Sequence, residues 1–210
     1  MEAGAVKEKI KVVLAALVKG LVVGVVARAW MRWISTDPEF SWSGSIFIVM
    51  AFMIFMVNHS IVKLLRQRFK GRRSVLIIRT GGVIFSLPIF TAAGGMMFPT
   101  VALASVATWN PALGKRTRGV LFLLALVIPI RISIDIISDF GWSFATIGRI
   151  LLFVSIYSVV IFATKPAVSP FRNEESDVVK MSKRQKIILV LAILAIGGLF
   201  LILTFGISGV

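Results

Sequence analysis

The sequence contains no cysteine and a single histidine, His59. The lack of cysteine excludes disulfides, thiolate metal ligands, iron–sulfur clusters and cysteine nucleophiles, and one histidine excludes any site that needs two imidazoles. No HExxH, Gly-x-Ser-x-Gly or Walker pattern occurs either. The sequence therefore predicts a protein that is not an enzyme and that needs no metal ion or other cofactor.

Acidic residues are also scarce. Nine of them stand against 24 lysines and arginines, which gives a formal net charge of +15 over 210 residues. A soluble domain this basic would suggest a nucleic-acid-binding protein. However, 58% of the residues are apolar, the mean hydropathy is +0.95, and the apolar residues form runs long enough to cross a bilayer. The composition therefore predicts an all-α, polytopic transmembrane helical bundle with its charge in the loops and no nucleic-acid partner.

Seven apolar segments of a length suited to membrane helices follow one another along the chain. They are 12–34, 45–64, 74–91, 94–109, 119–137, 142–164 and 187–208. The third and fourth form one stretch of about twice the length that a crossing needs, and the glycines near its middle allow a turn. The sequence predicts seven spans in a single transmembrane domain, 1–210, with a cytoplasmic connection at 165–186.

The basic residues are distributed unevenly between the two sides of these seven spans. Twenty of them, with five acidic residues, fall on the side of the N-terminus, whereas four basic and four acidic residues fall on the other side. Lysine and arginine are retained on the cytoplasmic side of a membrane. We therefore expect a multi-pass protein of the plasma (inner) membrane with a cytoplasmic N-terminus, an outer C-terminus and anionic lipid headgroups at its cytoplasmic face.

Two stretches about half a chain apart suggest an internal repeat. Residues 28–43 resemble residues 131–143, since both contain arginine, serine, aspartate, phenylalanine, tryptophan and a further serine in that order. Spans one to three (12–91) would then correspond to spans five to seven (119–208), with 94–110 as a linker span. This three-plus-one-plus-three plan resembles, in plan only, the sugar carriers of the SWEET class. Chance similarity is the alternative, because tryptophan favours any membrane interface.

Part of the first stretch carries a resemblance to a family. Trp30, Met31 and Arg32 are followed by Ser-Thr-Asp-Pro-Glu-Phe-Ser-Trp-Ser-Gly at 35–44. This signature, within residues 28–48 and about a tenth of the chain, resembles one in small uncharacterised polytopic membrane proteins of actinobacteria. That family has no assigned activity, so the resemblance implies a host group and no function.

A layer of charged residues near the outer ends of the spans is the candidate solute-binding site. It consists of Arg28, Arg32, Arg131, Asp135 and Arg149. Three of the arginines lie about seven residues, or roughly 10 Å, inside the outer interface. Charges at this depth face the protein interior or a wet cavity, and guanidinium groups hold carboxylates and phosphates. The alternative is that the arginines pair with acidic residues, among them those at 37–39, and tie helices together.

Two smaller features concern the packing of the spans. Gly20 and Gly24 form a Gly-x-x-x-Gly face, which allows two helices to approach closely. The polar residues at 58–60, Asn-His-Ser, lie inside the second span. They could serve an ion or proton path, or they could bond to a neighbouring helix.

Two functions fit these observations. The first is a small transporter or channel-like protein for an anionic or polar solute. The alternative is a non-catalytic scaffold or accessory subunit of a larger membrane complex, with a protein partner or a second copy of the chain bound to it. The repeat also relates Arg32 to Asp135, so we expect Asp135 to pair with Arg28 or Arg32.

Overall fold

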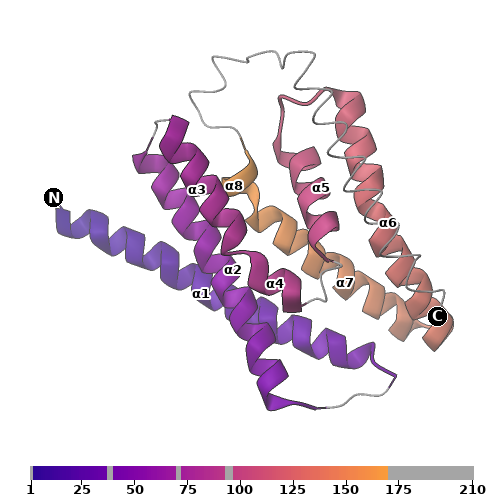
Figure 1. Ribbon diagram of the computed structural model, residues 1–210. Coiled ribbons are helices and arrows are strands. Elements are labelled where there is room, and N and C mark those ends of the chain that lie inside the picture. Colours follow the sequence, from indigo (N-terminus) through magenta and orange to yellow (C-terminus); the bar gives the residue numbers. More distant parts are fainter. Residues whose placement is uncertain (1, 37–39, 70–71, 93–96, 170–210) are drawn as a thin grey trace. The chain divides into compact units, whose positions relative to one another are not determined.

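The computed structural model describes residues 2–36, 40–69, 72–92 and 97–169, and within these ranges every regular element is a helix (Figure 1). All of these residues belong to one compact unit, Met1–Ser169. The elements are α1 (Glu2–Trp33), α2 (Trp42–Arg68), α3 (Arg72–Ile84), α4 (Leu87–Ala92), α5 (Met97–Trp109), α6 (Lys115–Phe140), α7 (Phe144–Ala163) and α8 (Lys165–Val168). The all-α class predicted from the sequence is confirmed.

Five apolar stretches of this part of the chain are long enough to cross a membrane. They are Val6–Trp33, Trp42–Arg68, Arg73–Thr91, Lys115–Phe140 and Phe144–Ala163. They coincide with five of the seven predicted spans. Their length and composition are compatible with an integral membrane protein.

The other two predicted spans are not confirmed. Helix α5 takes the place of the predicted span 94–109 and has 13 residues. At ~1.5 Å per residue it covers about 20 Å of a hydrocarbon core of ~30 Å, so it is too short to cross alone. The predicted span 187–208 lies outside the described residues, as do the C-terminus and most of the connection 165–186, whose first four residues form α8.

Helices α1 and α2 pack along each other through two glycines. A Cβ atom on Gly20 would lie 2.6 Å from the Cα atom of Met53, and one on Gly24 would lie 2.9 Å from the Cα atom of Val49. No side chain fits at these distances, so both positions need glycine for the helices to approach. The close-packing role predicted for this Gly-x-x-x-Gly face is confirmed.

The predicted third span is interrupted between α3 and α4. Pro88 lacks the N–H that would bond to the Ile84 carbonyl, and its ring crowds that carbonyl, which disfavours a continuous helix here, although α6 does continue through Pro129. The Ser86 N–H bonds instead to the Val83 carbonyl, three residues back, at 3.0 Å, which tightens the last turn of α3. Beyond the break, α4 continues along α2 (Figure 1).

Helix α5 is held at its C-terminal end by α6 and α7. The Arg118 guanidinium donates to the carbonyls of Ala107 (2.6 Å) and Thr108 (3.2 Å), which satisfies acceptors that a helix end leaves open. The Trp109 indole N–H donates to the Ile161 carbonyl of α7 at 2.9 Å. These bonds fix the ends of α5 and α7 together although α5 is short.

The two stretches that suggested a repeat are similar only at their helix starts. Ser41 caps α2 by accepting a hydrogen bond from the Gly44 N–H at 3.2 Å, and Ser143 caps α7 by accepting one from the Thr146 N–H at 3.1 Å. The packing behind the caps differs, because α1 and α2 pack far more extensively than α6 and α7. The second predicted unit, 119–208, extends beyond the described residues, so the repeat stays a prediction.

Candidate functional site

The first two arginines of the predicted charged layer stabilise the region where α1 meets α2. The Nε atom of Arg28 donates to the Ser45 hydroxyl at 2.9 Å. The Arg32 guanidinium lies over the Phe40 ring, 5.3 Å from its centre, at a distance typical of a cation–π contact. The acidic residues at 37–39, which were the alternative partners, lie outside the described residues. Arg28 therefore contacts the first turn of α2, and Arg32 contacts the connection between α1 and α2.

Arg131 and Asp135 form an ion pair along the surface of α6. The Arg131 Nε atom lies 3.2 Å from Asp135 Oδ1, and the two side chains are 64% and 53% exposed. Residues four apart on a helix share a face, so this pair forms within one helix. The expected pair between Asp135 and Arg28 or Arg32 is therefore wrong.

Arg149 of α7 lies between two aromatic rings. Its guanidinium carbon is 3.9 Å from the centre of the Phe140 ring and 5.2 Å from the centre of the Trp33 ring. Its Nε atom donates to the Trp33 carbonyl at 3.1 Å. The described residues supply no hydrogen-bond acceptor to its two Nη atoms. Arg149 thus links the ends of α1, α6 and α7 while it keeps donors for a ligand.

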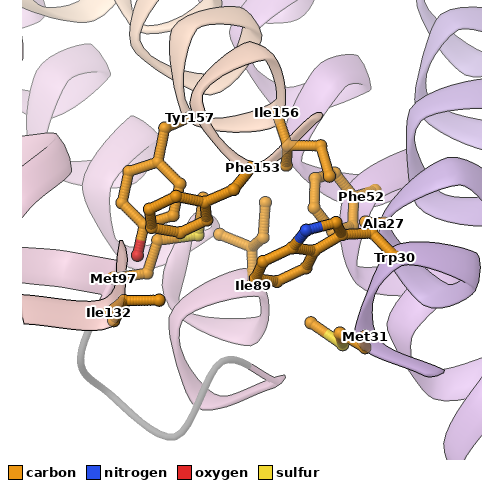
Figure 2. Close-up of a pocket in the computed structure, with 10 residues that line it drawn as sticks. All are labelled: Ala27, Trp30, Met31, Phe52, Ile89, Met97, Ile132, Phe153, Ile156 and Tyr157. Carbon is orange, nitrogen blue, oxygen red and sulfur yellow. The ribbon is translucent and has the colours of Figure 1, made fainter. Parts of the chain in front are cut away.

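An apolar cavity of about 260 Å³ lies between six helices (Figure 2). The Trp30 and Phe153 rings stack in its wall with 5.1 Å between their centres. The lining consists of Ala27, Trp30, Met31, Phe52, Ile89, Met97, Ile132, Phe153, Ile156 and Tyr157. In Figure 2 the Tyr157 hydroxyl is turned toward the side lined by Met97 and Ile132. This cavity contains none of the five predicted site residues.

Trp30 connects the cavity to Arg149. Its indole N–H donates to the Arg149 carbonyl at 2.8 Å, so the polar atom of the Trp30 ring is already satisfied. Arg149, Phe153 and Tyr157 are spaced four residues apart and share one face of α7. The Cα atom of Arg149 therefore lies about one helical turn, or roughly 6 Å along the axis, from that of Phe153 in the cavity wall.

Helix α4, which follows the break, contributes Ile89 to the lining of the same cavity. Asn58 of α2 donates from Nδ2 to the Gly82 carbonyl (2.7 Å) and to the Ser86 hydroxyl (3.2 Å). The Ser86 hydroxyl donates to the same carbonyl at 2.6 Å. These bonds satisfy the acceptor that the interrupted helix leaves open, as an apolar setting requires. Of the two roles considered for Asn58, bonding between helices is confirmed.

A second polar cluster surrounds α8. Arg66 of α2 donates through Nη1 to the Pro166 carbonyl and, at 2.8 Å, to the Ser169 hydroxyl. Arg79 of α3 donates to the Ser169 carbonyl at 3.1 Å. Cations are favourable at the C-terminal end of a helix, so the two arginines hold α8 against α2 and α3.

Comparisons with protein-family models, with curated proteins and with solved structures find no match to this chain. The site is therefore interpreted from its own geometry. Within the part of the chain that the structure describes, no group of three or more histidine, cysteine, aspartate or glutamate side chains is arranged to hold a metal ion.

Sequence reasoning identified Arg149 and missed the cavity beside it. In a membrane protein the wall of an internal cavity and a lipid-facing surface have similar apolar compositions, so composition does not separate them. One pattern in the sequence does point to the cavity. Arg149, Phe153 and Tyr157 are four residues apart, which places a charge, a ring and a hydroxyl on one face of a helix.

Proposed function

We propose that this chain is an integral membrane protein that transports an anionic solute across the plasma (inner) membrane, with the cavity beside Arg149 on the solute's path. The observation that carries the proposal is the interrupted helix α3–α4 at the edge of that cavity. Interrupted helices near the middle of the membrane form the substrate sites of many secondary transporters.

The depth of the break supports this role. Phe85 follows the start of the span Arg73–Thr91 by 12 residues, about 18 Å at ~1.5 Å per residue. In a hydrocarbon core of ~30 Å this corresponds to the outer half. Irregular backbone at such depth is tolerated where it is buried in protein or lines a cavity. At the break Ser86 is 4% exposed, and the open Gly82 carbonyl is satisfied by Asn58 and Ser86.

The sign of the solute follows from Arg149. The Trp33 and Phe140 rings contact the Arg149 guanidinium and hold it in place. The Nη donors of the guanidinium suit the two oxygens of a carboxylate or phosphate. The loop charges favour a cytoplasmic N-terminus. In that orientation Arg149 and the cavity belong to the outer half of the membrane.

The proposal can be tested without knowing the solute, because the chain has no cysteine. Ala27 and Ala125 are both buried in membrane spans, 1% and 2% exposed, but only Ala27 lines the cavity. Transport requires the cavity to open to the outer solution, and in that state a membrane-impermeant thiol reagent should label the Ala27→Cys variant in intact cells. The Ala125→Cys variant is the matched control and should stay unlabelled.

An unlabelled Ala27→Cys variant would contradict transport through this cavity. If a stoichiometric protein also co-purified after gentle detergent extraction, the result would favour the alternative, a scaffold or accessory subunit of a larger membrane complex. Equal labelling of both variants would show that the reagent reaches buried positions in general.

A further inference from the structure

We infer that the transported solute is a single-chain amphiphile, whose apolar chain enters the cavity and whose carboxylate or phosphate head is held by Arg149. This inference rests on the proposed transport of an anionic solute and names the chemical class of that solute. It follows from three observations: the size of the cavity, the chemistry of its wall and the position of the charge.

The size of the cavity suits part of a ligand. Pockets that enclose a whole small molecule measure about 300–1,000 Å³, whereas this cavity measures about 260 Å³. A ligand larger than the smallest solutes would therefore extend beyond it. The part that remains outside can lie at the level of Arg149, one helical turn away.

The wall of the cavity selects apolar groups. Eight of its ten lining side chains are purely apolar, and the indole N–H of a ninth, Trp30, already has the Arg149 carbonyl as its acceptor. A small polar solute would lose its hydrogen bonds to water here and regain few. The Phe153 ring stacks on Trp30 and meets Tyr157 edge-on at 4.6 Å (Figure 2). Two flexible methionines, Met31 and Met97, complete a wall that can adapt to a chain.

The charge has the geometry to hold the head of the same molecule. Arg149 shares a face of α7 with Phe153 and Tyr157, so the head and the chain would lie along one helix. The Phe140 and Trp33 rings fix the plane of the guanidinium, which favours a two-oxygen contact with an oxyanion. A neutral amphiphile of the same length would keep the contacts between its apolar chain and the cavity wall but would lack the ionic contact with Arg149.

Trp30 provides the readout, because it lines the cavity and is 8% exposed. The probes are three compounds that carry bromine at the end of the same alkyl chain: a fatty acid, an alkyl phosphate and an alcohol. Bromine quenches tryptophan fluorescence at short range. The purified full chain is titrated with each probe, and the Trp30→Phe variant measures the quenching of the four other tryptophans.

We expect saturable, Trp30-dependent quenching by the fatty acid or the alkyl phosphate, with an apparent Kd at least tenfold lower than that of the alcohol. The Arg149→Gln variant should weaken binding of the acidic probe about tenfold and leave the alcohol unchanged, and Arg149→Lys should restore part of the loss. The Arg116→Gln variant removes the same charge at an exposed position at the start of α6 and should bind as the unmodified chain does. Thermal unfolding of each variant verifies that it is folded.

Two outcomes would overturn the inference. The first is equal affinity for the alcohol and both acidic probes, and the second is the absence of saturable Trp30 quenching by any of the three. Neither outcome affects the labelling of the Ala27→Cys variant, which tests transport separately. Saturable binding of an acidic probe without labelling of Ala27→Cys would support the amphiphile site and contradict transport.

Discussion

Gly20 is a position where one added methyl group should damage the bundle. A Cβ atom there would lie 2.6 Å from the Met53 Cα atom and 2.9 Å from the Phe52 carbonyl oxygen, so α1 and α2 would have to separate. We expect Gly20→Ala to lower the free energy of unfolding by about 1–3 kcal/mol, the usual cost of overpacking. Denaturant titration in detergent micelles, followed by circular dichroism, measures this change.

Gly119 is the matched control for that substitution. It also lies within a helix, α6, but a Cβ atom there would meet nothing within 4 Å. Gly119→Ala should raise stability by roughly 0.5–1 kcal/mol, because alanine loses less backbone entropy in a helix. A Gly20→Ala variant as stable as Gly119→Ala would contradict the close approach of α1 and α2.

Asn58 is a second residue whose effect can be measured. Asn58→Leu keeps a similar size and removes both donors to the Gly82 carbonyl and the Ser86 hydroxyl. Hydrogen bonds between membrane helices contribute about 0.6 kcal/mol on average and up to ~1.7, so we expect a loss in that range by the same titration. Ser155→Ala removes a bond within α7 on an exposed face and should change stability by less than ~0.5 kcal/mol. Equal losses would argue against a special role for Asn58.

The charged layer was predicted only in part, because the sequence gives the depth of a side chain but not its direction. Distance from the interface gives the depth of a side chain, but each residue turns a helix by about 100°. Arg131 is 64% exposed whereas the next residue, Ile132, lines the cavity. The sequence therefore predicts the depth of each side chain in the membrane. It does not predict the direction of the side chain, because that direction depends on which helices surround it.

Among the elements, α1, α2, α6 and α7 follow the predicted spans closely, because long apolar runs have few alternatives to a helix in a membrane. The region 74–109 follows its prediction only in part, because Arg73–Thr91 is long enough to cross whereas α5 is not. Its hydropathy is continuous, so counting residues suggested two equal crossings. Pro88 and the bonds of Asn58 instead separate α3 from α4. Pro88 disturbs the helix only near its own position. The hydrogen bonds from Asn58 come from another helix, so the sequence of the segment 74–109 does not reveal them.

The role of the break between α3 and α4 can be tested by removing it. Pro88→Ala restores an N–H that can bond to the Ile84 carbonyl, which permits one helix from Arg72 to Ala92. We expect stability to rise by about 1 kcal/mol, the net value of a typical hydrogen bond, and thiol labelling of Ala27→Cys to become slower. Labelling that is unchanged in the straightened helix would mean that the break has no part in access to the cavity.

For the whole molecule, the topology is the first property to establish. Single cysteines in place of Ser138, exposed near the end of α6, and of Ser176, in the connection 165–186, can be probed in intact cells with an impermeant thiol reagent. Ser138→Cys should be labelled and Ser176→Cys protected. The reverse pattern would invert the orientation derived from loop charge, and labelling of both would contradict the number of crossings between them.

The unequal lengths of the spans connect the cavity to the thickness of the bilayer. Without the charged residues up to Lys11, the span Val6–Trp33 keeps about 22 residues and Phe144–Ala163 has 20, or about 33 and 30 Å at ~1.5 Å per residue. The shorter span matches a hydrocarbon core of ~30 Å, and a longer one fits by tilting. Trp30 of α1 stacks on Phe153 of α7 in the cavity wall. We expect a thicker bilayer to reduce the tilt of α1 and to shift the Trp30 ring against the Phe153 ring, so that lipid composition changes the width of the cavity.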